Sequence, residues 1–325
     1  MKISSFWVDP QVQLRASDLL PPDQPAKPWP PQHPVRFNAL VRFLAFVGLL
    51  AAVAVVTGSI YFAVTTRDPL QASYWQTEVT LIVSCLVAYL VTGLVTEGRL
   101  DLIELSPHRL SGLLRGLLFG LAAVAVCLGL LAALGAYRVV GVNHDYVPWA
   151  DLMTLGLGAA LTEEIMFRGV ALRLLEDVFG SWAAVALTAT SFGLLHVANP
   201  EGTWQGGVAI VIEAGLLLAA IYIVSRSLWW VMGFHFAWNM AQGPLFGSVV
   251  SGSEERQTWL VAELTGPDWL TGGVFGLEAS LVPVVLLGGV AVWLLVLAQR
   301  RGLMVAPWWV RRRRLLAEAA QTASP

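Results

Sequence analysis

Long apolar segments recur along this chain and are separated by short polar ones. Eight of them are long enough to cross a lipid bilayer or nearly so, because a helix of about 20 apolar residues spans the hydrocarbon core. These segments are residues 39–65, 76–96, 112–136, 148–172, 181–198, 206–225, 228–246 and 276–298. The pattern therefore predicts an all-α fold, a polytopic transmembrane bundle of about eight helices.

The composition agrees with a membrane protein. Of the 325 residues, 56% are hydrophobic and 13% are charged, whereas about 25% of the residues in a soluble domain are charged. This apolar surplus is too large for one soluble core. The segments 181–198 and 228–246 are short and contain histidine, so hydropathy alone supports these two spans less strongly than the others.

The basic residues indicate an orientation for the bundle. If both termini are cytoplasmic, 17 of the 20 lysines and arginines fall inside, and only Arg67, Arg138 and Arg256 fall outside. Cytoplasmic loops of membrane proteins carry such an excess of basic residues. We therefore predict a multi-pass protein of the lipid bilayer with both termini in the cytoplasm.

Aromatic and sulfur-containing residues add two smaller expectations. Indole rings favour the headgroup level, so tryptophans at segment ends are expected there: Trp75, Trp149 and Trp204 outside, and Trp182, Trp229, Trp230, Trp308 and Trp309 inside. Cys85 and Cys127 both fall in apolar segments. They are predicted to be reduced packing residues, without a disulfide framework.

Three regions follow along the chain. Residues 1–37 are rich in proline and are predicted to form a disordered cytoplasmic tail. Residues 38–300 form the transmembrane domain, and its polar motifs are confined to 150–245. Residues 301–325 form a basic cytoplasmic tail in which Arg311–Arg314 are predicted to anchor on anionic lipid. Nothing else in the sequence favours nucleic acid as a partner.

The first polar motif is Glu163-Glu164-x-x-x-Arg168, inside the fourth apolar segment. An ionisable group at the bilayer centre costs about 2.5–3.5 kcal/mol, so it needs a structural or functional reason. Glu164 and Arg168 are spaced i, i+4 and can pair, while Glu163 points about 100° away. Pairing of both glutamates with Arg168 and Arg173 at the membrane edge explains this motif equally well on its own.

Two further motifs carry histidine. They are Phe192-x-x-x-His196 in the fifth segment and His235-x-x-x-Asn239 in the seventh. Phe192 lies one turn from the His196 ring, and His235 and Asn239 share a helix face. A lone histidine or a His–Asn pair is often structural, but the helical rise places all of these groups and Glu163 near one depth in the membrane.

Such a cluster suits hydrolysis. A carboxylate in a low-dielectric cavity is a candidate general base, and donors near it can stabilise an oxyanion. Glu163, His196 and His235 could instead bind zinc and activate water that way. The sequence lacks His-Glu-x-x-His, so we favour a mechanism without a cofactor.

The three motifs, in this order, resemble those of the CAAX-protease and bacteriocin-processing family of intramembrane endopeptidases. The resemblance covers about residues 150–245, and no motif position departs from the family pattern. It implies that residues 38–300 are an eight-helix protease domain whose site opens to the cytosol and the lipid. The substrate it implies is a membrane-tethered protein or peptide, such as one with a lipidated C-terminus.

The resemblance also implies roles for the motif residues. Glu163 and His196 would activate water, His235 and Asn239 would stabilise the oxyanion, and Glu164 and Arg168 would be structural or orienting.

Glu213, a buried carboxylate in the sixth segment, leaves an alternative open. It could be a supporting partner of a histidine or of Arg168, or it could be a protonated group facing a neighbouring helix. A proton-coupled transporter would use Glu213 and the same polar groups as a relay. A third hypothesis is an immunity or binding module that keeps the fold without turnover.

Overall fold

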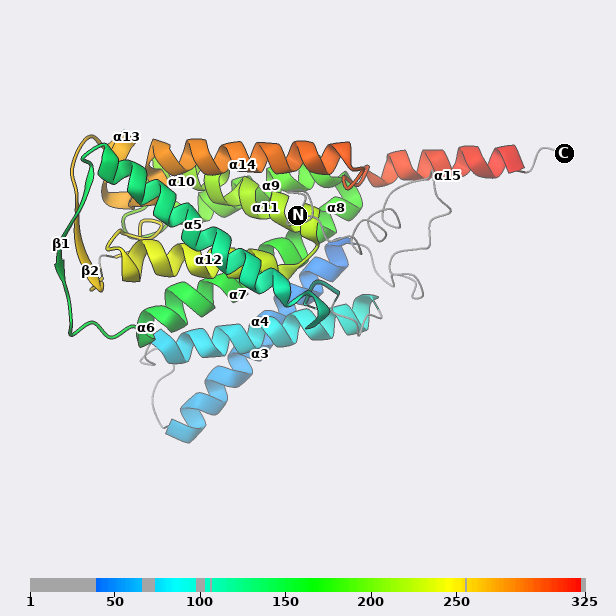
Figure 1. The fold of residues 1–325 in the computed structure, drawn as a ribbon. Helices are drawn as coiled ribbons and strands as arrows, with labels where there is room; N and C mark the ends of the chain where they lie inside the picture. Colours follow the sequence, from blue (N-terminus) through cyan, green and yellow to red (C-terminus); the bar gives the residue numbers. More distant parts are fainter. Residues whose placement is uncertain (1–38, 66–73, 98–102, 106, 255, 323–325) are drawn as a thin grey trace.

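The structure is a computed structural model, and it describes residues 39–65, 74–97, 103–105, 107–254 and 256–322. The predicted disordered tail, residues 1–37, lies outside these ranges. Over the described residues the chain is a bundle of helices with one two-stranded sheet (Figure 1). The predicted all-α class is confirmed.

Five helical segments are long and apolar enough to cross a membrane, among the residues that the structure describes. Four are the single helices α3 (Ala39–Thr65), α4 (Tyr74–Glu97), α5 (Ser111–Ala133) and α14 (Leu281–Arg300). The fifth runs without a break through α10 (Trp204–Ile210), the π-helical η6 (Val211–Gly215) and α11 (Leu216–Ser225). The protein is therefore an integral membrane protein, while the count of about eight spans stays a prediction.

The other three predicted spans are also helical, and they carry the three motifs. The first is a continuous helix with two π-helical stretches, made of α6 (Trp149–Asp151), η4 (Leu152–Gly158), α7 (Ala159–Glu164), η5 (Ile165–Leu172) and α8 (Arg173–Phe179). The second is α9 (Ser181–His196), and the third is α12 (Leu228–Met240) followed by the π-helical η7 (Ala241–Leu245). Their ionisable residues lower the hydropathy of the first and third, and α9 has only 16 residues. π-Helical turns inside α-helices occur frequently at functional sites.

One end of the bundle, which we call the strand end, carries the sheet. Strands β1 (Tyr137–Val142) and β2 (Leu260–Leu264) pair antiparallel there, with a bulge between Val139 and Gly141. Figure 1 shows α6 and the short helix α13 (Asp268–Thr271) at the same end. The amide of Trp259 donates to the carbonyl of Pro244 at 2.8 Å, which ties the sheet to the end of η7.

The opposite end of the bundle, which we call the arginine end, is held by buried or half-buried ion pairs. Arg226 donates to the Glu176 carboxylate at 2.5 and 2.8 Å, and Arg42 donates to Asp177 at 2.8 Å. Arg109 donates to the backbone carbonyl of Arg226. These bonds join the starts of α3 and α12 to the end of α8. Helix α15 (Trp308–Thr322) extends from this end (Figure 1).

Four short 3₁₀ turns complete the described elements. The turns η2 (Ile103–Leu105) and η3 (Pro107–Arg109) precede α5, and η8 (Gly273–Phe275) and η9 (Leu277–Ala279) precede α14.

Glycines bring α5 and α12 into backbone contact. A Cβ added at Gly116 would lie 2.2 Å from the carbonyl oxygen of Trp230, and one added at Gly233 would lie 2.4 Å from that of Leu113. Small residues allow this close approach of helices in membranes. The contact fixes α12, which carries His235 and Asn239, against the scaffold.

The expectations for single residues were met in part. Cys85 and Cys127 are buried free thiols, as predicted. Trp149 and Trp204 are exposed and lie at the strand end. The expectation for Trp230 is wrong: it is only 2% exposed and packs in the core, with its ring centroid 5.9 Å from that of Phe119. The glycines of α5 make room for this indole.

Candidate active site

Glu164 and Arg168 form a buried ion pair. Arg168 Nη1 donates to Glu164 Oε1 at 2.9 Å, and the two side chains are 1% and 0% exposed. Arg168 Nη2 also donates to the carbonyl of Gly215 at 3.3 Å, and its guanidinium lies 4.7 Å from the ring centroid of Phe192. The i, i+4 pairing suggested by the spacing is therefore present, and each of the two buried charges has a partner of opposite sign.

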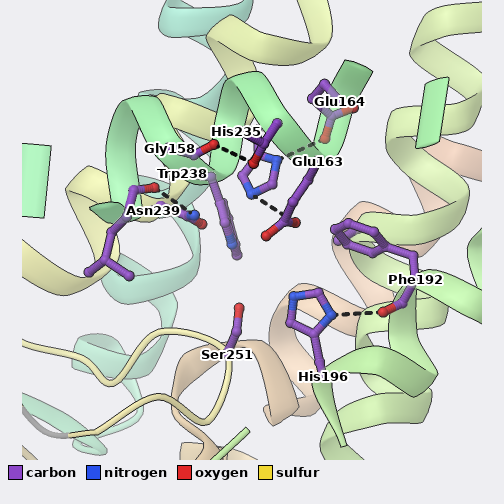
Figure 2. Close-up of polar contacts among 12 residues, drawn as sticks. Gly158, Glu163, Glu164, Phe192, His196, His235, Trp238, Asn239 and Ser251 are labelled. Atoms are coloured by element: carbon purple, nitrogen blue, oxygen red, sulfur yellow. Dashed lines mark hydrogen bonds and ion pairs between the residues drawn. The ribbon is translucent and has the colours of Figure 1, made fainter. Parts of the chain in front are cut away.

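The same carboxylate holds His235. Nδ1 of His235 lies 2.8 Å from Glu164 Oε1, and because an ionised carboxylate only accepts, Nδ1 carries the hydrogen. Nε2, the other ring nitrogen, then points towards Glu163, whose Oε2 is 4.0 Å away (Figure 2). Arg168, Glu164 and His235 thus form one chain of interactions that fixes the orientation of the imidazole.

Glu163 differs from Glu164 in its surroundings. Its side chain is 29% exposed, against 0% for Glu164. Its Oε2 atom is buried and has no hydrogen-bond partner in the described part of the chain. The carboxylate of Glu78 in α4 acts electrostatically on Glu163. Glu78 also packs tightly against the helix that carries Glu163, because a Cβ added at Gly158 would lie 2.5 Å from Glu78 Oε2. The carboxylate of Glu163 is therefore the less constrained of the pair.

His196 faces the same gap as Glu163. Its Nδ1 lies 2.7 Å from the backbone carbonyl oxygen of Phe192, so Nδ1 carries the hydrogen and Nε2 has the lone pair in the neutral ring. Figure 2 shows Nε2 directed at the gap between Glu163, Trp238 and Ser251. The Phe192 ring lies 4.8 Å from the His196 ring and 6.3 Å from the His235 ring, between centroids, and so packs beside both imidazoles.

Asn239 lies on the other side of His235. Its Nδ2 donates to the carbonyl oxygen of Leu155, in the π-helical stretch η4, at 3.0 Å. The side chain is buried. A primary amide has two N–H groups, so one remains for a ligand after this bond.

Glu213 lies in η6 and is 1% exposed. Its Oε1 atom has no hydrogen-bond partner among the residues described. Arg168 donates to the backbone carbonyls of Ala214 and Gly215 rather than to this carboxylate. The hydrogen bonds of His196 and His235 described above are made with Phe192 and Glu164, not with Glu213. A supporting role for Glu213 therefore stays a prediction.

Glu278, in η9, is a buried carboxylate that we did not single out from the sequence. It is 2% exposed. Its Oε1 accepts from Trp238 Nε1 and Gln242 Nε2, both at 2.8 Å, and its Oε2 accepts from the amide and hydroxyl of Ser251 at 2.6 and 2.7 Å. An acidic residue near the start of the predicted span 276–298 is the signal that could have found it.

Glu278 thus links Ser251 to Trp238 and Gln242 at the site. Ser251 has a left-handed backbone conformation, with φ of 51°, which is unfavourable for a residue other than glycine. Asn199 adds a bond from Nδ2 to the Ser251 carbonyl at 2.6 Å. The segment after η7 is thus held beside the gap that Glu163 and His196 face (Figure 2).

Among the described residues, the structure offers no ready ligand set for the zinc alternative. No group of three or more His, Cys, Asp or Glu side chains is placed to hold a metal ion within the described ranges. Glu163 Oε2 and His235 Nε2 are 4.0 Å apart, which is wider than the spacing of about 3.4 Å between two tetrahedral ligands that each lie about 2.0–2.2 Å from one zinc ion. We therefore derive no step through a metal.

The described bundle thus brings a carboxylate, two imidazoles and an amide together as one candidate site. Residues 145–241 match the family model described as "Type II CAAX prenyl endopeptidase Rce1-like". This range contains all three motifs, so the match over these residues confirms the resemblance seen in the motifs. The comparisons with curated proteins and with solved structures gave no match.

Proposed function

We propose that the protein is an intramembrane endopeptidase that hydrolyses a peptide bond in a membrane-associated protein or peptide. The Rce1-like domain supports the class of activity. The observation that carries the proposal is the carboxylate of Glu163, which has a buried oxygen without a hydrogen-bond partner among the described residues and shares its gap with two histidines. The domain match favours this activity over a proton-coupled transporter or a non-catalytic immunity module.

Glu163 and His196 are proposed to activate the attacking water. Because Nδ1 of His196 is bonded to the Phe192 carbonyl, Nε2 can accept one hydrogen of a water in the gap. Glu163 accepts the other and takes the proton as the water attacks the peptide carbonyl. The proton then passes to the leaving amine. A positioned general base contributes about 10²–10⁴-fold in rate.

His235 and Asn239 are proposed to stabilise the oxyanion. Asn239 offers its second N–H, and His235 donates through Nε2 when the ring is protonated. Each such donor contributes about 10²–10³-fold. Glu164 and Arg168 position His235 through the bond to Nδ1, and they do not contact the reacting atoms in this mechanism.

Cleavage of a membrane-tethered reporter peptide by the purified protein tests the proposal. Glu163→Gln keeps the size of the side chain and removes the base, so we expect the rate to fall by about 10²-fold or more. The cleavage rates of His196→Ala and His235→Ala are expected to fall by a similar factor. Glu263→Gln, an exposed carboxylate in β2, is the matched control and should cleave like the wild type. If all three site variants cleave at the wild-type rate, the assignment is wrong.

A metal measurement separates the two mechanisms. The proposed mechanism predicts that active purified protein contains well under one zinc ion per chain and keeps its activity in a zinc chelator. Elemental analysis that finds one zinc per chain in the wild type, and none in Glu163→Gln, would support the metallo-endopeptidase instead.

A further inference from the structure

We propose that Ser251 is a further substrate-binding residue of this site and that Glu278 orients it. In this arrangement the Ser251 hydroxyl accepts the N–H of the peptide bond that is cut. This role rests on the proposed function and deepens it, because the roles proposed above concern the water and the carbonyl oxygen and leave the N–H of the bond unbound. The substrate class is then a secondary amide, which excludes a proline directly after the cleaved bond, since proline has no N–H.

The Glu278 carboxylate determines how the Ser251 hydroxyl is turned. It accepts from Trp238 Nε1, Gln242 Nε2 and the Ser251 amide at 2.8, 2.8 and 2.6 Å, and these three groups can only donate. An ionised carboxylate only accepts, and its two oxygens offer about four acceptor sites. The Ser251 hydroxyl lies 2.7 Å from Oε2 and fills the fourth site with its hydrogen. The lone pairs of the hydroxyl are left for another partner.

The backbone of Ser251 is fixed before any substrate binds. Its left-handed conformation, with φ of 51°, is sparsely populated for residues other than glycine, and such conformations cluster at functional sites. Asn199 Nδ2 donates to the Ser251 carbonyl at 2.6 Å, and the Asn199 amide donates to the His196 carbonyl at 3.3 Å. Ser251 is therefore tied to the end of α9 through Asn199 and to α12 through Glu278 and Trp238.

The Ser251 side chain is directed into the gap where the peptide would bind. Figure 2 shows it on the side of the gap away from His235 and Asn239, and the residue is half-buried, so a ligand can reach it. The carbonyl oxygen and the N–H of a trans peptide bond point in opposite directions. A peptide whose carbonyl is directed at His235 and Asn239 therefore directs the N–H of the same bond at Ser251.

Two membrane-tethered reporter peptides test this contact. One has an ordinary amide at the cleaved bond, and in the other an ester oxygen replaces the N–H. Ser251→Gly removes the hydroxyl, and glycine suits a φ of 51°. We expect kcat/KM of this variant to fall about tenfold for the amide, because its N–H is left without an acceptor. For the ester, kcat/KM should stay at the wild-type value or rise, because the hydroxyl lone pairs repel the ester oxygen.

The ratio of the amide rate to the ester rate separates binding from stability. Both rates are measured on one preparation, so a loss of folded protein cancels in the ratio. Ser253→Gly, a half-buried position in the same segment, is the matched control and should keep the wild-type ratio. Glu278→Gln should lower the ratio as Ser251→Gly does, because the N–H that it gains competes for the lone pairs of Ser251.

The outcomes also separate this role from the proposed function. A wild-type ratio in Ser251→Gly, whether both rates are unchanged or both fall equally, overturns the assignment of Ser251 alone. If the wild-type protein cleaves neither peptide faster than Glu163→Gln, the proposed function fails, and the role of Ser251 fails with it.

Discussion

At the scale of single residues, the site depends on one network of charged side chains that both stabilises the fold and orients a proposed catalytic group. Glu164 Oε1 accepts from both Arg168 and His235. The same carboxylate therefore neutralises a buried guanidinium and sets the hydrogen position on an imidazole. Glu163, next to it in sequence, is left with a partly exposed carboxylate. Two adjacent glutamates thus have different surroundings because the helix turns them to different neighbours.

A double-mutant cycle tests this network. Glu164→Gln leaves the buried Arg168 without its counter-charge, and breaking a buried pair on one side destabilises by about 3–5 kcal/mol. Arg168→Met should do the same to Glu164. The double variant removes both charges, so we predict that it is more stable than the sum of the single effects by about 0.5–3 kcal/mol. Unfolding in detergent measures this, and additive losses would contradict the pairing.

The motif residues could be predicted from the sequence because each is a polar side chain in an apolar run. Glu164 and Arg168 could even be paired from their spacing. Glu278 could not be assigned a role, because its donors Trp238, Gln242 and Ser251 come from distant positions and no spacing links them. The contact of Asn239 with the Leu155 carbonyl could not be predicted either, because the pattern of side chains in the sequence does not show which backbone carbonyls of a π-helical stretch accept a bond.

At the scale of elements, the position of the site depends on the crossing of α5 and α12. Gly112, Gly116 and Gly120 lie at i, i+4 intervals on the face of α5 that touches α12. The apolar pattern predicted both helices, but it could not predict their contact. Apolar residues surround each helix in a membrane bundle, so hydropathy does not mark the buried face. The close approach of the two helices is evident only in the structure, where a Cβ added at these glycines would meet the facing helix.

Glycine substitutions in α5 test this crossing. A Cβ at Gly116 would meet the backbone of Trp230 and Phe234 at 2.2 and 2.6 Å, and backbone atoms cannot move aside without shifting α12. Gly116→Ala is therefore expected to lower both the unfolding temperature and the rate of peptide cleavage.

Gly129→Ala in the same helix is the matched control, because a Cβ there meets nothing within 4 Å. It should leave cleavage unchanged and stabilise by up to about 1 kcal/mol through helix propensity. Equal effects of the two substitutions would mean that the backbone contact does not position α12.

At the scale of the whole molecule, the two ends of the helical bundle differ in charge and in structure. One end is held by arginine contacts that join α3 and the start of α12 to α8, and the other carries a small sheet and polar cavities. The sequence predicted this charge separation through the positive-inside pattern. It did not predict that Ser251, in the segment between η7 and β2, lies beside the site, because no spacing in the sequence links this segment to the motifs.

The most direct test of the central claim is a comparison of membrane peptides from cells that contain the wild type or Glu163→Gln at equal levels. Mass spectrometry of new chain ends would identify the substrate and the position of cleavage together. We predict that at least one membrane-associated protein is cut only in the presence of the wild type, at a peptide bond near the membrane surface. Identical sets of chain ends in the two samples would contradict the assignment of Glu163 as the base of an intramembrane endopeptidase.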